Sequence, residues 1–87
     1  MASYRVEIKR SAAKELENIG GKKDRQRIAE KILELANEPR PVGVEKLTDK
    51  EQYRLRQGNY RILYEIHDDV LLVVVIRIAD RKNAYRR

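Results

Sequence analysis

The sequence contains no cysteine among its 87 residues. A disulfide framework, a zinc site built on cysteine and a thiol nucleophile are therefore excluded, and the composition suits a reducing compartment. The longest apolar run, residues 70–76, is far too short for a membrane span. The N-terminal segment alternates charged and apolar residues, so it lacks the apolar core of a secretory signal peptide. These features predict a soluble, cytoplasmic protein.

Histidine is nearly absent as well, because His67 is the only one. A single histidine next to a predicted Asp68-Asp69 turn cannot form the paired-histidine site of common nucleases. The carboxylates of Asp68, Asp69 and Asp80 lack the spacing of a metal site. We therefore expect neither a metal ion nor a cofactor.

Positive charge is abundant, since 20 lysines and arginines face 14 acidic residues and leave a formal net charge of +6. Such a balance favours a polyanionic partner, either a nucleic acid or an acidic protein. Many small proteins are basic only because charge prevents association. The positions of the arginines must therefore decide between these interpretations.

The pattern of apolar residues predicts one strand and two helices in the N-terminal half. Residues 4–9 alternate with the period of a half-buried strand. Residues 11–19 and 23–37 repeat apolar side chains at helical spacing, and Gly20-Gly21 separates the two helices. Residues 39–50 hold both prolines and no sustained period, so we expect a loop there.

The C-terminal half is predicted to form strands at residues 52–57, 60–67 and 70–79, joined by tight turns at Gly58-Asn59 and Asp68-Asp69. The last strand is almost entirely aliphatic, which predicts a central position with both faces covered. The order of elements indicates an α+β fold in a single domain over residues 1–87. It has an N-terminal strand, a two-helix hairpin and a three-stranded antiparallel meander, with both helices on one face of the sheet.

Three arginines are candidates for a site on the other face. Arg54 and Arg56 alternate with apolar neighbours in the second predicted strand, and Arg61 opens the next one. If these three share a face, their guanidinium groups form an anion site. Arg81 follows the last strand, and Tyr85 lies within reach of the same face if the tail folds back.

Such a cluster suits RNA cleavage, because attack of a 2′-hydroxyl on the adjacent phosphate builds negative charge that fixed guanidinium donors stabilise. Tyr85 could stack on a base, or it could cover the sheet edge. Each arginine taken alone is better explained as an ordinary solvated surface charge. The five positions together favour a phosphate-binding surface.

Three segments carry a resemblance to the RelE/ParE toxin superfamily over nearly the whole chain. They are YRVEIKRSAAKELENI at residues 4–19, YRLRQGNYRILYEI at residues 53–66 and VVVIRIADRKNAYRR at residues 73–87. The chain is most similar to the RelE branch of type II toxin–antitoxin systems. The resemblance implies the RelE-like fold and a metal-independent endoribonuclease that enters the A site of the 70S ribosome, cleaves mRNA and inhibits translation.

The resemblance also implies roles for the five positions. Arg61, Arg81 and Tyr85 correspond to catalytic positions, and Arg54 and Arg56 to positions that bind RNA phosphate. A cognate acidic antitoxin, similar to RelB, is the implied protein partner. The best-studied relative has lysines at the places of Arg54 and Arg56, and arginine cannot act as a general base.

Two other functions stay open. The ParE branch blocks DNA gyrase without cleaving RNA, and its members typically lack this set of arginines. A catalytically inactive module that binds RNA or the ribosome is the other alternative. It is favoured by arginine in place of titratable lysine, and by Asp80 where many relatives have a basic residue.

Overall fold

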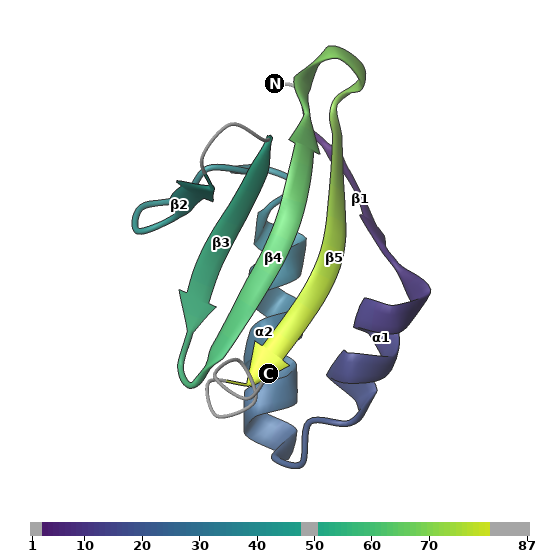
Figure 1. Ribbon diagram of the computed structural model, residues 1–87, viewed down its shortest axis with the longest axis vertical. Helices are drawn as coiled ribbons and strands as arrows, with labels where there is room; N and C mark the ends of the chain where they lie inside the picture. The colour runs from purple at the N-terminus through teal and green to yellow at the C-terminus, as the bar shows by residue number, and fades with distance from the viewer. Residues whose placement is uncertain (1–2, 48–50, 81–87) are drawn as a thin grey trace.

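The computed structural model describes residues 3–47 and 51–80. Its elements follow in the order β1 (Arg5–Ile8), α1 (Arg10–Glu17), α2 (Lys22–Glu34), β2 (Glu45–Leu47), β3 (Gln52–Gln57), β4 (Tyr60–His67), the short 3-10 helix η1 (Asp68–Val70) and β5 (Leu72–Asp80). The sheet faces the viewer in Figure 1, and α2 crosses behind it. The predicted α+β fold is confirmed, including the helix pair that precedes the C-terminal strands.

The strands form one five-stranded sheet in the order β1-β5-β4-β3-β2. Neighbouring strands are antiparallel except for β1, which runs parallel to β5. The predicted meander is therefore present as β3, β4 and β5. Because β1 pairs with β5, the last strand lies inside the sheet, as predicted.

The loop predicted for residues 39–50 is wrong in one part, because it contains β2. Glu45, Lys46 and Leu47 pair antiparallel with the first half of β3. A strand of three residues is too short for an alternating pattern to be recognised in the sequence. Its position matters because Glu45 lies directly opposite Arg54.

The prediction that β5 is covered on both faces is also wrong. Val73 and Val75 are fully buried, whereas the residues that alternate with them, Leu72, Val74 and Ile76, are only half-buried. One face of β5 therefore packs on the helices and the other belongs to the open face of the sheet. The aliphatic run in the sequence reflects strand propensity as much as burial.

The connection from β4 to β5 differs from the predicted tight turn. Asp68, Asp69 and Val70 form η1, and Leu71 follows in the left-handed conformation with a φ of 52°. A residue with a side chain pays for this conformation with strain of order 1 kcal/mol or more. The alternation of the flanking strands gives no sign of such a turn.

A β-bulge interrupts the pairing of β4 with β5. Leu63 lies opposite Arg77, but the next residue, Tyr64, lies opposite Val75, so Ile76 is an extra residue. The bulge reverses the alternation of β5, because the buried positions run from Val75 to Ile78. It therefore places Arg77 on the same face as Leu63, away from the core.

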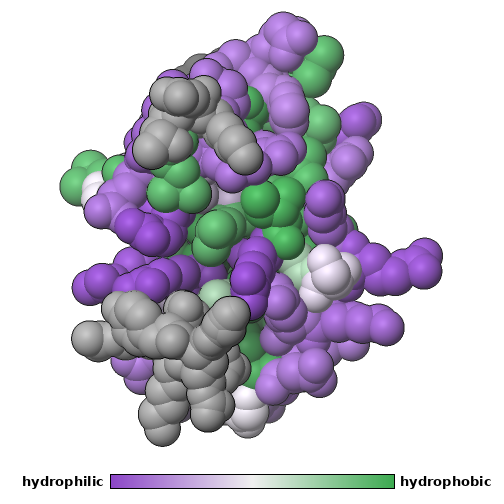
Figure 2. All heavy atoms as spheres, in the orientation of Figure 1, coloured by the Kyte–Doolittle hydropathy of each residue, from purple (hydrophilic) through white to green (hydrophobic). Residues whose placement is uncertain are grey.

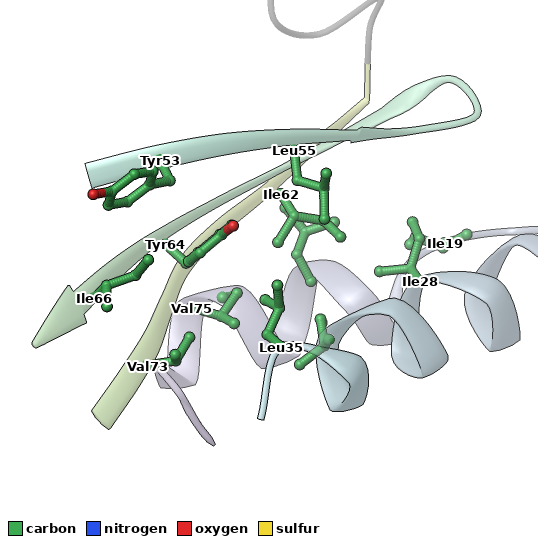
Figure 3. Packing of buried hydrophobic residues seen from close by; sticks show 13 residues of the cluster. Ile19, Ile28, Leu35, Tyr53, Leu55, Ile62, Tyr64, Ile66, Val73 and Val75 are labelled. Carbon is green, nitrogen blue, oxygen red and sulfur yellow. The ribbon is translucent and has the colours of Figure 1, made fainter. Parts of the chain in front are cut away.

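The core lies between the helical layer and one face of the sheet (Figure 3). Ile28, Ile32 and Leu35, from the helical segment predicted at residues 23–37, are buried in one cluster with residues of β3, β4 and β5. Tyr53 and Tyr64 stack on the sheet side, with 5.9 Å between ring centroids. In the part of the chain that the structure describes, no helix is long and apolar enough to cross a membrane.

Candidate functional site

The predicted arginines of β3 and β4 meet on the open face of the sheet. Arg56 lies directly opposite Arg61, and Arg54 follows on the same face of β3. Together they line an open cavity of about 340 Å³, here called the arginine cleft. Its lining residues are Gly43, Glu45, Arg54, Arg56 and Arg61. The structure thus brings together three of the five residues that the sequence singled out.

Glu45 is the member of this cleft that the sequence analysis missed. Its Oε1 atom accepts hydrogen bonds from Arg54 Nη2 at 2.6 Å and from Arg54 Nε at 3.0 Å. The hydrogen bonds from Arg54 lower the pKa of the Glu45 carboxyl, and the charges of Arg54, Arg56 and Arg61 lower it further. Glu45 is therefore an ionised carboxylate at neutral pH, surrounded by guanidinium groups.

The electrostatic balance of the cleft stays positive, since three arginines against one glutamate leave a formal charge of +2. Arg54 already shares its charge with Glu45. Within residues 3–47 and 51–80, Arg56 makes no hydrogen bond or ion pair, and its side chain is exposed. A phosphate entering the cleft would therefore meet guanidinium donors and, beside them, one carboxylate that can accept a proton.

The other two candidates, Arg81 and Tyr85, lie outside the described residues. Asp80, the last residue of β5, lies opposite Tyr60. In the described ranges, no three His, Asp or Glu side chains gather closely enough to hold a metal ion. His67 is the last residue of β4, in agreement with the strand predicted at residues 60–67, and its Nε2 lies 3.2 Å from Glu65 Oε1.

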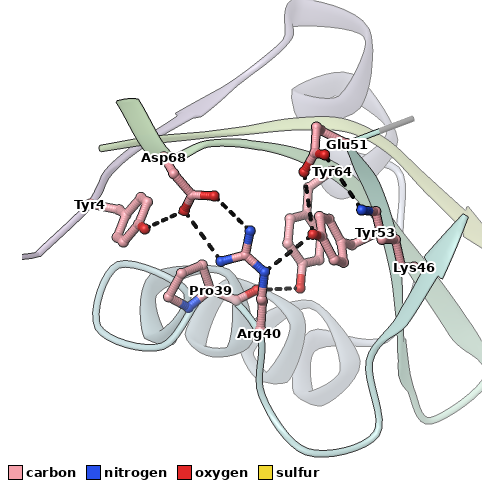
Figure 4. A network of polar contacts seen from close by, with 8 residues as sticks. All are labelled: Tyr4, Pro39, Arg40, Lys46, Glu51, Tyr53, Tyr64 and Asp68. Carbon is pink, nitrogen blue, oxygen red and sulfur yellow. Dashed lines mark hydrogen bonds and ion pairs between the residues drawn. The ribbon is translucent and has the colours of Figure 1, made fainter. Parts of the chain in front are cut away.

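A polar network fixes the segment that leads into the cleft (Figure 4). Arg40 donates two hydrogen bonds to the carboxylate of Asp68, at 2.8 and 3.2 Å, and a third to the hydroxyl of Tyr53. Next to it, the buried Tyr64 hydroxyl donates to the carbonyl oxygen of Pro39 at 2.7 Å. The chain is therefore held shortly before Gly43 and Glu45, which form one wall of the cleft.

The Arg40 network joins elements that are far apart in the sequence. Asp68 lies in η1, and Tyr4, just before β1, donates a hydrogen bond to the same carboxylate. The hydrogen bonds from Arg40 and Tyr4 lower the pKa of Asp68 to about 2. Nothing in the local sequence pattern signals this ion pair, because its partners are separated by 28 residues.

Comparison with known families gives one match across most of the chain. Residues 6–85 match the model of a family described as the ParE toxin of the type II toxin–antitoxin system parDE. Among curated proteins, no relative matches.

Several solved structures resemble this chain closely. A RelE–RelB complex from Pyrococcus horikoshii is 28% identical with a TM-score of 0.82, and the alignment covers 98% of this chain and 99% of that one. The toxin–antitoxin complex RelBE2 from Mycobacterium tuberculosis is 25% identical with a TM-score of 0.80, covering 92% and 100%. The isolated Escherichia coli RelE toxin, 22% identical with a TM-score of 0.77 over 90% and 84%, shares the fold.

Proposed function

The chain belongs to the ParE toxin family of type II toxin–antitoxin systems, within the RelE/ParE superfamily, and we propose that it is a ribosome-dependent mRNA endonuclease of the RelE type. The observation that carries this proposal is the convergence of Arg54, Arg56 and Arg61 in one cleft on the open face of the sheet. The likeness to RelE structures supports the RelE branch. The substrate would be mRNA in the ribosomal A site.

The proposed reaction is an internal transfer at one phosphate. The 2′-oxygen of the preceding ribose forms a bond to phosphorus, and the 2′-proton passes to a base. The bond from phosphorus to the 5′-oxygen breaks, which leaves a 2′,3′-cyclic phosphate and a 5′-hydroxyl that takes its proton from water. Arg56 and Arg61 stabilise the negative charge that develops on the phosphoryl oxygens. We keep Arg81 and Tyr85 in the proposal as a further cationic group and a residue that stacks on a base.

Glu45 supplies the base that an all-arginine site lacks. Arginine holds its proton under all ordinary conditions, whereas Glu45 is ionised and lies beside the guanidinium groups that would bind the phosphate. Its lowered pKa makes it a weak base, so its contribution depends on position more than on basicity. In this scheme Arg54 binds phosphate and orients Glu45.

An acidic antitoxin is the proposed protein partner. The solved relatives from Pyrococcus horikoshii and Mycobacterium tuberculosis are toxin–antitoxin complexes. The formal charge of +6 on this chain and its positive cleft suit an acidic protein that competes with RNA for the open face.

The proposal is tested by incubating a defined mRNA with the purified protein, with and without ribosomes, and mapping the cut ends. We expect cuts within the A-site codon that need ribosomes and disappear in Arg61→Ala. Arg27→Ala is the matched control, because it removes the same charge from an exposed position on α2. An intact message with wild-type protein, or full cleavage by Arg61→Ala, would contradict the proposal.

A second candidate function is inhibition of DNA gyrase, which the description of the matching family favours. A supercoiling assay with purified gyrase separates the two, since an mRNA endonuclease of this kind leaves supercoiling unchanged.

Tight binding to ribosomes without cleavage would instead identify an inactive RNA-binding module. The Glu45–Arg54 ion pair favours that outcome if it excludes phosphate from the cleft.

A further inference from the structure

A fourth arginine, Arg77, lies on the open face outside the arginine cleft. We propose that Arg77 and the neighbouring Leu63 form a second RNA subsite, which binds a phosphate adjacent to the one held in the cleft. This inference rests on the proposed function, because it assigns the next contact of the same RNA strand.

The β-bulge at Ile76 is the first observation that supports this subsite. Val73 and Val75 point into the core, so strict alternation would direct Arg77 there too. The extra residue reverses the phase, and the side chain of Arg77 is instead 58% exposed. Bulges of this kind re-aim side chains beside functional sites. Ile78 then takes the buried position that follows.

The register of the sheet sets the distance between the two subsites. Arg54, Leu63 and Arg77 lie in one row across β3, β4 and β5. Two steps between neighbouring strands separate the backbones of the two arginines by about 10 Å. An RNA strand that crosses the β-strands in this direction can therefore present different phosphates to Arg54 and to Arg77.

The residue between the two arginines in this row is Leu63, and two further apolar residues of β5 lie beside it on the open face. Leu63, Val74 and Ile76 are half-buried on this face. Figure 2, which views the open face, shows an apolar patch near its centre with hydrophilic side chains on either side. A ribose or a base placed between two bound phosphates would lie on such a patch and remove it from water. Sites for single-stranded RNA combine cationic side chains that follow the backbone with side chains, most often aromatic, on which the bases pack.

Glu15 of α1 fixes the position of Arg77. One carboxylate oxygen accepts a hydrogen bond from the backbone N–H of Ile78 at 2.7 Å, and the other lies 3.6 Å from Arg77 Nε. Glu15 and Asp80 both line a cavity of about 300 Å³ next to Arg77. These carboxylates reduce the local positive charge, so the second subsite should bind phosphate more weakly than the arginine cleft.

The test measures cleavage of ribosome-bound mRNA by wild type, Arg77→Ala and the control Arg27→Ala over a range of toxin concentrations. We expect Arg77→Ala to raise the half-saturating concentration about threefold to fivefold, because the loss of one exposed ion pair weakens binding by about this factor. The maximal rate should stay unchanged. The affinity of Arg77→Ala for mRNA should also depend less steeply on salt than that of wild type. The slope of log affinity against log salt should be smaller in magnitude by about 0.7. Arg61→Ala should instead lower the maximal rate.

A neutral methylphosphonate, placed in turn at each phosphate flanking the scissile one, identifies the contact. At one of these positions, the methylphosphonate should raise the half-saturating concentration of wild type as much as the Arg77→Ala change does. The same methylphosphonate should not raise the half-saturating concentration of Arg77→Ala any further. Cleavage by Arg77→Ala indistinguishable from Arg27→Ala, or additive effects at both phosphates, would overturn the second subsite and leave the endonuclease intact. No cleavage by wild type would overturn the proposed function itself.

Discussion

Glu45 is the single residue on which the proposed cleavage most depends, since it is the proposed base. We expect Glu45→Gln to lower the maximal rate of cleavage about 100-fold or more, as for loss of a general base. The amide can still accept the hydrogen bond from Arg54, so the shape of the cleft should persist. Because neighbouring arginines lower the pKa of Glu45, the wild-type rate should not fall through its protonation between pH 8 and pH 5. Single-turnover cleavage on ribosomes measures both effects.

A rate for Glu45→Gln equal to that of wild type would remove Glu45 as the base. A rate faster than wild type would show that the carboxylate competes with the phosphate for Arg54. Arg54→Lys serves as the companion variant, since it keeps the charge and loses the two-nitrogen contact with Glu45.

Tyr64 shows how one buried hydroxyl supports the segment before the cleft. Its side chain is fully buried, and its hydroxyl donates to the carbonyl of Pro39. Tyr64→Phe keeps the ring and its stacking with Tyr53 but leaves this carbonyl without its partner. We expect the free energy of unfolding to fall by about 1–2 kcal/mol. Urea denaturation measures this change, and an unchanged midpoint would show that the hydrogen bond contributes nothing.

At the scale of secondary-structure elements, the Arg40–Asp68 ion pair connects the segment that follows α2 with η1. The pKa of Asp68 is about 2 in the folded protein and 3.8 without its partners. The ion pair therefore stabilises the fold fully above pH 4, and this contribution is lost as the pH falls from about 4 to about 2. The difference in stability between wild type and Asp68→Asn should therefore be largest at pH 6, and it should shrink steadily as the pH falls from 4 to 2.5.

Urea midpoints of the two proteins at pH 6, 4, 3 and 2.5 test this convergence. Since every other acidic residue titrates in both proteins, the difference between them isolates Asp68. Asp69→Asn is the control, because Asp69 lies next in the chain and makes no hydrogen bond or ion pair among the described residues. A difference that stays constant with pH would mean that the ion pair is not the source of stability.

The sequence predicted the helices and strands whose apolar residues repeat over enough positions to show a helical or a strand period. Both helices, β3 and β4 were predicted, and the alternation in β3 and β4 correctly placed Arg54, Arg56 and Arg61 on one face. The sequence alone could not reveal β2 because its three residues contain no full alternation. Glu45 was missed for the same reason, since its place opposite Arg54 depends on that pairing.

The position of Arg77 was not predicted either, because a bulge is defined by the pairing between two strands and not by the sequence of one. Counting along β5 alone directs Arg77 towards the core, and only the pairing with β4 shows the extra residue at Ile76. The ion pair between Arg40 and Asp68 is likewise a tertiary contact between distant segments. Patterns of period two or 3.6 describe one element at a time, so contacts of this kind follow from the assembled fold.

At the scale of the whole molecule, one layer of helices and one sheet share a single core. Ile28 of α2 is fully buried in the same cluster as Ile62 of β4 and Val75 of β5. A change on the helix side of the core should therefore destabilise the sheet equally. We expect Ile28→Val to lower the free energy of unfolding by about 0.5–1.5 kcal/mol.

The same substitution tests whether the layers unfold together. Far-UV circular dichroism follows the helices, and tyrosine fluorescence follows the sheet, where Tyr53 and Tyr64 are buried. Both signals should shift to the same lower urea midpoint in Ile28→Val, as a two-state transition requires. Leu33→Ala on the same helix is the control, because Leu33 is 69% exposed and its loss should change the midpoint little. If the circular dichroism midpoint moved while the fluorescence midpoint did not, the helices would unfold separately, and the sheet that carries the arginine cleft would be stable without them.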